Sequence, residues 1–376
     1  MIDVVAVRRD LHAHPELAYA EKRTTGVIFD HLSAQGLSPQ ILPAGTGVRC
    51  DLGTGSGPIL GLRADIDALP IEDLKQVPYR STHDGACHGC GHDAHTAILL
   101  GVADALAASP PRGRVRLIFQ PAEETLPGGA LSVIASGALD GVDRIFALHC
   151  DPRLDTGRIG LRVGPITAAC DQVDVALAGP GGHTARPHLT ADLVYAAGQL
   201  ITELPGTLSR RVDPRAALSL VWGAVEAGRA ANAIPTSGRL QGTLRVFDRE
   251  AWDGAEPLVR SLVEQIAAHS GTSAVLTYVR GVPPVDNDAA CVEIQRAAVA
   301  AALGADAVAD TPQSMGAEDF AWYLQSIPGA LARLGVRHPG APAFDLHQGT
   351  FDIDEDALAV GVDYTVALVR QALASR

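Results

Sequence analysis

Short apolar segments alternate with helical patterns through much of this 376-residue chain, and this alternation most limits the fold it can adopt. Runs typical of strands cover residues 59–70, 114–120 and 142–149, and helical patterns at 96–108 and 129–137 separate them. Strands separated by helices usually pair in parallel, and such sheets bind ligands at the carboxyl ends of their strands. The sequence therefore predicts an α/β fold built on a mostly parallel sheet.

Side chains that can bind a metal lie at the carboxyl ends of these strands and in the loop that precedes the helical pattern at 96–108. Two pairs of carboxylates, a histidine and a loop rich in thiols and imidazoles supply them: Asp65, Asp67, Glu123, Glu124, His149, Cys87, His88, Cys90, His92 and His95. Because parallel strands end at one edge of a sheet, we expect donors from separate segments to converge there. Thiolate, imidazole and carboxylate are ligands for zinc and related divalent ions.

The loop 87–95 holds the densest group of donors. We expect Asp93 to cap the following helix, and the helix dipole to favour the thiolate form of the cysteines. A redox pair at Cys87 and Cys90, half of a four-cysteine structural zinc site, and a loop with chance histidines are the competing interpretations. The sequence has no second Cys-x-x-Cys pair, which disfavours the structural zinc site.

The pattern changes near residue 168, where alternating strands with one exposed face begin. Four such strands and two helical segments follow, at 171–178, 190–203, 217–226, 238–247, 250–270 and 274–279. We interpret them as a smaller α+β domain inserted into the first. The expected division is a catalytic domain at 1–168 and 284–376, with a lid or dimerisation domain at 169–283.

Composition excludes several classes of protein. With 30 Lys and Arg against 43 Asp and Glu, the formal net charge of −13 disfavours nucleic acid or an anionic membrane as a partner. The first residues lack the apolar core of a signal peptide, and we find no apolar run of the roughly 18 residues that a membrane span needs. The 6 cysteines are too sparse for a disulfide scaffold. We expect a cytoplasmic chain with reduced thiols.

Near the N-terminus, His12 and His14 stand two residues apart, so on a helix they would not share a face. Pro15 also biases His14 away from helical backbone. We expect both to be hydrogen-bonded structural histidines and treat metal binding by them as the less favoured alternative.

An ordered set of motifs along essentially the whole chain resembles the M20 family of metallopeptidases and amidohydrolases. The likeness is closest to the branch with N-acyl-amino-acid amidohydrolases, hippurate hydrolase and plant auxin-conjugate hydrolases. The matching stretches are residues 9–16, 62–70, 90–97, 120–124, 147–149, 181–183, 232–235, 316–320 and 346–347. Each stretch alone is weak evidence, whereas the combination is specific.

The resemblance implies a site for two divalent metal ions, with zinc expected and manganese, cobalt or nickel as alternatives. The implied ligands are Cys90, His92, Glu124, His149 and His347. Because these are few side chains for two ions, at least one donor must bridge them, unless Asp65 also contributes. Asp65 and Asp67 are otherwise expected to contact and orient the ligands.

The resemblance also implies roles in catalysis and substrate binding. Glu123 is the expected general base, taking a proton as a hydroxide held by the metal ions attacks the acyl carbonyl. His183, from the second domain, is expected to stabilise the oxyanion, with a surface turn histidine as the alternative. Asn232 and Arg245 are candidates for binding the substrate carboxylate, although Arg245 could equally lie on a solvated face. A homodimer is implied by the likeness alone.

The expected function is metal-dependent hydrolysis of the amide bond of N-acyl-L-amino acids, and the runner-up is an M20-type dipeptidase or carboxypeptidase acting on short peptides. A cysteine-nucleophile hydrolase, with Cys90 activated by His92 or His95, and a non-catalytic homologue are the remaining alternatives.

Three features depart from the family pattern: Thr125-Leu126-Pro127 after the glutamate pair, Cys87 where relatives usually have methionine, and Gln348-Gly349 after His347. The first and third could reshape the substrate pocket, and the second adds a thiol near the metals.

Overall fold

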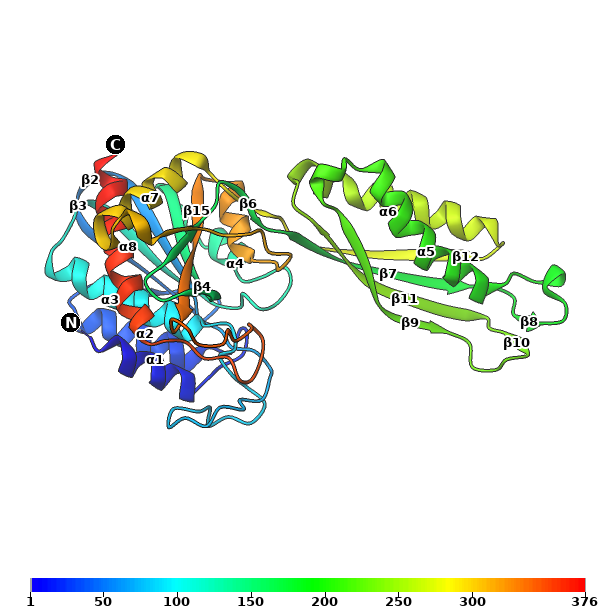
Figure 1. The fold of residues 1–376 in the computed structure, drawn as a ribbon, viewed down its shortest axis with the longest axis horizontal. Helices are drawn as coiled ribbons and strands as arrows, with labels where there is room; N and C mark the ends of the chain where they lie inside the picture. The colour runs from blue at the N-terminus through cyan, green and yellow to red at the C-terminus, as the bar shows by residue number, and fades with distance from the viewer. Residues whose placement is uncertain (1, 376) are drawn as a thin grey trace. The chain divides into compact units, whose positions relative to one another are not determined.

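The computed structural model describes residues 2–375, and two compact units share them (Figure 1). The first unit extends to Ile166 and resumes at Val285–Pro312 and from Asp319 onward. The second unit comprises Thr167–Pro284 and the short segment Gln313–Glu318. The predicted α/β class, with a smaller inserted α+β unit, is confirmed. The roles expected for the two domains, catalysis in one and a lid or dimer contact in the other, stay predictions.

A seven-stranded, mostly parallel sheet forms the centre of the first unit. Its order is β1-β2-β4-β15-β5-β14, with β3 also paired to β2. β1 is antiparallel to β2 and β5 is antiparallel to β15, whereas the other pairs are parallel. The strands are β1 (Gln40–Ile41), β2 (Val48–Asp65), β3 (Arg112–Gln120), β4 (Val142–Asp155), β5 (Ile159–Leu161), β14 (Val308–Asp310) and β15 (Gly329–Arg337).

Helices cover both faces of this sheet (Figure 1). They are α1 (Val4–Ala13), α2 (Lys22–Ala34), α3 (His92–Ala108), α4 (Ala130–Ala135), α7 (Ala289–Leu303) and α8 (Asp356–Ala374), with 3-10 helices η3 (Ala305–Ala307) and η4 (Asp319–Gln325). A small ribbon pairs β6 (Gly164–Thr167) with β13 (Val285–Asn287).

The period-two alternation of strand side chains divides the core into two layers. On β3, Leu117 and Phe119 pack in the cluster formed with α2, α3, α7 and α8, whereas Ile118 packs in the cluster formed with α4 and η4. On β4, Phe146 faces the first cluster and Ile145 the second. Both faces of these strands are therefore buried, as a parallel sheet between helices requires.

The structure corrects the expected end of one strand. The apolar run at 142–149 continues as β4 to Asp155, because β15 pairs alongside it and Arg333 lies opposite His149. His149 therefore lies within a long strand and not at its end. By contrast, β2 does end at Asp65 and β3 at Gln120, where these two residues pair.

The second unit is a four-stranded antiparallel sheet in the order β12-β7-β11-β9, with α5 and α6 packed against it (Figure 1). Its elements are β7 (Ala169–Ala178), β8 (Gly182–His183), η1 (Pro187–Leu189), α5 (Leu193–Arg211), η2 (Pro214–Ala216), β9 (Ser219–Ala227), β10 (Ala233–Ile234), β11 (Ser237–Val246), α6 (Arg249–His269) and β12 (Ser273–Val282). β8 pairs with β10 as a separate two-stranded ribbon.

One helix, α8, has the length and composition that a membrane span would need, with a window of mean hydropathy 1.3. Leu358, Tyr364, Leu368 and Val369 of this helix belong to the core cluster of the first unit. Its apolar character therefore has an explanation in the packing of that core.

We expect truncation of a buried core residue to destabilise the first unit. Leu100 on α3 is fully buried, so Leu100→Ala should lower the free energy of unfolding by about 2–5 kcal/mol. The matched change Leu131→Ala removes a side chain on α4 that is 39% exposed and should cost clearly less. Urea unfolding of both variants measures the difference, and equal losses would contradict the assigned core.

Candidate metal and catalytic site

Donors from two separate segments, the turn before α3 and strand β4, meet in the first unit. Cys90, His92 and His149 are all buried, and their ligand atoms lie within 4.8 Å of one another. The Cys90 Sγ is 3.6 Å from the His149 Nε2. Gly91, at a φ of 90°, lets the chain turn between Cys90 and the first residue of α3, His92. The turn thus directs two neighbouring donors to one centre.

A second group adjoins the first. Cys90, Glu124 and His347 also have ligand atoms within 4.8 Å of one another, and the His347 Nε2 lies 3.5 Å from the Glu124 Oε1. The His92 Nε2 is 3.8 Å from the same oxygen. The structure therefore brings together all five side chains that the resemblance implied as ligands, and Cys90 belongs to both groups.

Hydrogen bonds fix which ring nitrogen faces this centre. The His92 Nδ1 donates to the backbone oxygen of Asp67 at 2.9 Å, and the His149 Nδ1 donates to that of Cys150 at 2.8 Å. Because a carbonyl oxygen only accepts, each Nε2 is left without a proton in the neutral ring. This is the arrangement in which imidazole binds a metal and a neighbouring group orients the ring.

Two buried atoms at the centre have no hydrogen-bond partner among the described residues, the His92 Nε2 and the Glu124 Oε1. Buried polar atoms are nearly always hydrogen-bonded, so two facing side-chain atoms that have no such partner call for a ligand. The thiol, imidazole and carboxylate donors together fit divalent transition metals. The residues present therefore fit the expected metal ions.

His95 lies against this centre but is not available as a ligand. Its Nδ1 pairs with the Asp65 Oδ1 at 2.6 Å, and its Nε2 accepts the backbone N–H of Cys150 at 2.9 Å. Both nitrogens are therefore used. Asp65 in turn is bound by Arg63 at 2.6 Å, and its Oδ2 is 3.7 Å from the His92 Nε2. Asp65 is thus held by Arg63 and lies next to the ligand candidate His92.

Asp67 is hydrogen-bonded to two of the ligand candidates, Glu124 and His92. Its Oδ2 accepts the backbone N–H of Glu124 at 2.9 Å, and its Oδ1 is 3.2 Å from the His92 Nδ1. Glu123, the expected base, places its Oε2 3.9 Å from the His92 Nε2. Glu123 and Glu124, adjacent in sequence, therefore both reach the same centre.

Burial and nearby carboxylates determine the protonation of this group. Burial, reinforced by Glu124 and Glu123, raises the pKa of the Cys90 thiol well above its ordinary value. Burial also raises the pKa of Glu124, although His92 opposes the shift. The direction of this shift is opposite to our expectation of a thiolate at Cys90, because burial and the neighbouring carboxylates disfavour the charged form. Metal binding would release these protons.

Asp93 does not cap α3 as we expected; that position belongs to Gly91, and Asp93 lies inside the helix. Its buried carboxylate instead binds Arg8 at 2.9 Å and His12 at 2.7 Å, both from α1. His12 also contacts Asp73 at 3.3 Å. His12 therefore forms structural hydrogen bonds, as we expected.

Cys87 belongs to this neighbouring cluster, within 4.8 Å of ligand atoms of His12 and Asp73. Its Sγ lies 3.5 Å from the Lys75 Nζ, which also pairs with Asp73 at 2.9 Å. Acidic and basic groups compensate one another here, so we interpret the cluster as a structural ion-pair network. The other early histidine, His14, bonds the backbone oxygen of Asp10 at 2.8 Å.

The remaining candidates lie in the second unit. His183 and Asn232 are exposed and adjacent, since β8 pairs with β10 and the backbone N–H of Thr184 donates to the Asn232 oxygen at 3.3 Å. The His183 Nδ1 accepts the N–H of Ala185 at 3.0 Å, so the proton of the neutral ring is on Nε2. Arg245, on β11, donates to the backbone oxygen of Met315.

Sequence reasoning missed the side chains that support the sheet edge. Arg63 binds Asp65, Gln120 and Asp319 at 2.6, 2.9 and 2.8 Å, all buried. An arginine among the apolar residues near the end of β2 was the available signal, because a buried charge needs partners. Asp319 lies 256 residues from Arg63 in sequence and also accepts the N–H of Ala130 at the start of α4.

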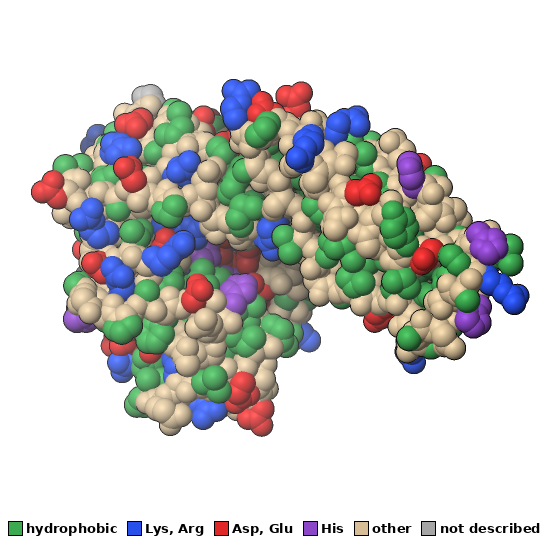
Figure 2. Space-filling model, turned by 45° about the vertical axis from the view of Figure 1, so that its right-hand side comes forward, with side chains coloured by type: hydrophobic (Ala, Val, Ile, Leu, Met, Phe, Trp, Pro, Cys, Tyr) green, Lys and Arg blue, Asp and Glu red, His purple; other side chains and the backbone are tan. Residues whose placement is uncertain are grey.

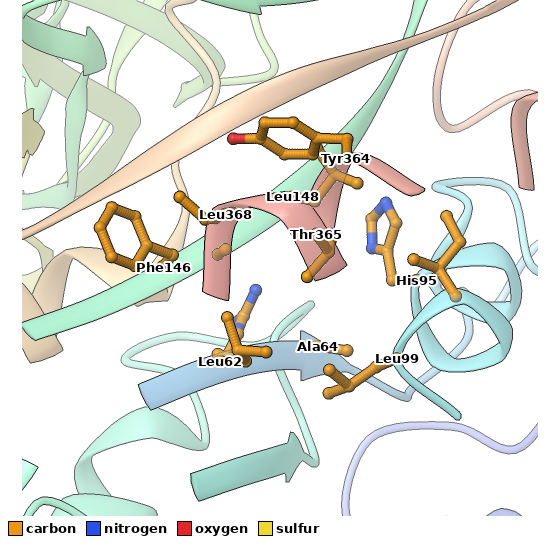
Figure 3. Close-up of a pocket in the computed structure, with 12 residues that line it drawn as sticks. Leu62, Ala64, His95, Leu99, Phe146, Leu148, Tyr364, Thr365 and Leu368 are labelled. Carbon is orange, nitrogen blue, oxygen red and sulfur yellow. The ribbon is translucent and has the colours of Figure 1, made fainter. Parts of the chain in front are cut away.

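A small cavity lies behind the site, next to His95 (Figure 3). Side chains of β2, β4, α3 and α8 line it, among them Leu62, Leu99, Phe146, Leu148, Tyr364 and Leu368. At about 20 Å³ it has room for about one water molecule, not for an organic substrate. On the outer surface that Figure 2 shows, Lys and Arg side chains are interspersed with Asp and Glu side chains.

Comparisons with known proteins give matches over nearly the whole chain. The model of peptidase family M20/M25/M40 matches residues 61–371. A protein of Rhodococcus jostii named putative glutamate–cysteine ligase 2-3 is 52% identical over 98% of this chain, which covers 46% of that relative. An N-acetyl-L-cysteine deacetylase of Bacillus subtilis is 40% identical over 94% of this chain and 84% of its own length. The chain thus spans about half the length of the first relative and most of the second.

A solved structure of the same family is also similar to this chain. The crystal structure of a Bacillus subtilis protein described as a dinuclear metal-binding peptidase of the M20 family has a TM-score of 0.87 and 34% identity, covering 99% of this chain and 98% of that one. The resemblance predicted from the ordered motifs is confirmed.

We expect His12 to make stability depend on pH. Burial lowers the pKa of His12, but the Asp93 charge and hydrogen bonds with Asp73 and Asp93 outweigh it and raise the pKa to about 10. The stabilisation is therefore complete below about pH 6.5, the pKa of an unfolded histidine, and is lost as pH rises through 10.

Breaking this buried pair with His12→Gln should cost about 3–5 kcal/mol near pH 6, and the difference from wild type should shrink toward pH 10. Urea unfolding across this range measures it, with exposed His338→Gln as the control that should stay close to wild type. A difference that does not change with pH would show that His12 is not charged in the folded protein.

Proposed function

We propose that this chain, which belongs to peptidase family M20/M25/M40, is a two-metal amidohydrolase of N-acyl-L-amino acids. The chain is a hydrolase by family, so the proposal concerns the bond, the substrate and the residues that act. The observation that carries the proposal is that five possible metal ligands lie together: Cys90, His92, Glu124, His149 and His347. Two of their buried atoms have no hydrogen-bond partner among the described residues.

Cys90, His92, Glu124, His149 and His347 would hold the two ions, and Cys90 belongs to both of the ligand groups described above. Zinc suits the thiolate and imidazole donors best, and manganese, cobalt or nickel remain compatible with this set. Divalent ions here would polarise the amide carbonyl and lower the pKa of water to about 7.

Glu123 is proposed as the general base. It takes a proton from the attacking water and delivers it to the leaving amine. Its place beside the ligand Glu124, with its carboxylate 3.9 Å from the His92 Nε2, suits this role. Asp67 holds the Glu124 backbone and the His92 ring, and so limits movement of the base relative to the ligands.

The substrate roles of the second unit are also proposals. A proton on the His183 Nε2 makes this ring a hydrogen-bond donor, as stabilisation of an oxyanion requires. The adjacent Asn232, and Arg245, are proposed to bind the substrate carboxylate. A homodimer formed through this unit is proposed as well, since α5 and the edge strand β9 expose Tyr195, Val221 and other apolar side chains.

For the substrate, we propose a small N-acyl amino acid, and we place N-acetylcysteine first because a relative that matches along most of its length is named for that deacetylation. The cytoplasm, where thiols stay reduced, is the proposed compartment. Short peptides are the second candidate class, favoured by the solved relative described as a peptidase.

A cysteine-nucleophile mechanism is disfavoured by charge. A nucleophilic thiol needs a lowered pKa, whereas burial and two glutamates raise the pKa of Cys90. His95, the alternative base for that mechanism, has both ring nitrogens in hydrogen bonds.

We expect Glu123→Gln to lower kcat by about 10²–10⁴-fold, because the amide cannot accept a proton from water. The metal content, measured by elemental analysis, should stay that of wild type, since Glu123 is not among the proposed ligands. Full activity in a variant that retains its metal would show that another group is the base.

We expect the reconstituted enzyme to release amine from N-acetyl-L-amino acids, with N-acetylcysteine among the better substrates, and to lose this activity on chelation. A panel of N-acetyl and N-benzoyl amino acids and dipeptides, assayed with each of the four candidate metals, ranks the substrates. Faster release from dipeptides would make the enzyme a peptidase of the same mechanism. Activity that survives complete metal removal would overturn the two-metal proposal.

A further inference from the structure

Glu21 is a buried carboxylate that the proposed mechanism does not use. It occupies the N-cap position of α2, where a side chain ordinarily accepts N–H groups of its own helix, yet it makes no such bond. Instead its Oε1 accepts the backbone N–H of Ala122 at 2.8 Å, across 101 residues of sequence. The same oxygen accepts the N–H of Tyr19 at 2.9 Å.

The two residues that Glu21 binds share an unusual backbone. Tyr19 and Ala122 have φ angles of 63° and 59°, and both are residues other than glycine. Such left-handed conformations cost energy for residues with a Cβ and persist only where neighbouring groups hold them. Ala122 is fully buried, so its N–H would have no water to bond if the Glu21 oxygen were removed.

Ala122 directly precedes the proposed base, Glu123. The tripeptide 122–124 is held at both ends by carboxylates, since Glu21 accepts the N–H of Ala122 and Asp67 accepts that of Glu124 at 2.9 Å. Beyond it, the N–H of Gly129 donates to the Ala122 oxygen at 2.8 Å and closes the turn. The direction of the Glu123 side chain therefore depends on the conformation at Ala122.

We propose that Glu21 is a positioning residue for the general base: it holds Ala122 in the left-handed conformation that directs Glu123 to the metal centre. This inference rests on the proposed function, because it needs Glu123 to be the base. Glu21 itself touches neither the ligand candidates nor, by this proposal, the substrate.

The proposed role does not require Glu21 to be charged. Burial, together with the nearby Asp67 charge, raises the pKa of Glu21 to about 7 despite the N–H groups that it accepts. Its Oε2 has no hydrogen-bond partner among the described residues, so only Oε1 is used. Because Oε1 accepts in either protonation state, glutamine offers the same acceptor and is the natural conservative variant.

We expect Glu21→Ala to lower kcat by about 10²-fold, the cost of a misplacement of about 1 Å, with KM and metal content close to wild type. Glu21→Gln should restore most of kcat. In the Glu21→Ala background, Ala122→Gly should recover part of kcat, since glycine adopts a positive φ without strain.

The matched control is Glu16→Ala. Glu16 also supports the start of α2, accepting the N–H groups of Arg23 and Thr24 at 2.9 and 2.8 Å, so its carboxylate holds α2 and not the 122–124 segment. It should lower the melting temperature and leave kcat unchanged. If Glu16→Ala lowers kcat as much as Glu21→Ala, or if Glu21→Gln is as inactive as Glu21→Ala, the positioning role is wrong.

The outcomes separate this inference from the proposed function. If Glu123→Gln is inactive and Glu21→Ala has wild-type kcat, only the positioning role fails. If Glu123→Gln is fully active with bound metal, the base assignment fails first, and the role of Glu21 with it. Should Glu21→Ala not fold, the Glu21→Gln and Ala122→Gly variants still carry the test, since Glu21→Gln must then keep kcat and Ala122→Gly must not lower it.

Discussion

Ion pairing at one buried arginine is the interaction on which the site depends. Arg63 lies within β2 and is almost completely buried, a position that is unfavourable for a charge without partners. It binds Asp65 in its own strand, Gln120 at the end of β3 and Asp319 at the start of η4. Three segments from distant parts of the chain are thereby fixed relative to one another at the edge where the ligand candidates gather.

From this anchor, contacts extend to the metal centre in two steps. Asp65 holds His95, and His95 accepts the N–H of Cys150, which follows the ligand candidate His149 in β4. On the other side Asp67 holds His92 and the backbone of Glu124. His149, His92 and Glu124 are thus each held in place by neighbouring groups, which is how sites keep their donors within a few tenths of an ångström.

The convergence of donors could be predicted because it follows from a general property of parallel sheets. Apolar runs that end in Asp65 and in the Glu123–Glu124 pair identify strand ends, and strand ends in a parallel sheet lie at one edge. Asp93 shows where such reasoning fails. Local sequence favours it as a cap, but its partners Arg8 and His12 lie more than 80 residues away, and burial with them outweighs the local preference. Glu21 was missed for the same reason.

The balance of charge at this edge explains why a pair of divalent ions suits it. Arg63 compensates Asp65, and His92 faces Asp67, but Glu123 and Glu124 add further negative charge close to the same ring. Burial of this excess raises the pKa of both Glu124 and Cys90, so protons neutralise the group when no stronger cation is present. Metal ions that displace those protons would turn an unfavourable cluster of donors into a stable one. Affinity should therefore fall as pH falls, because protons and metal compete for the same atoms.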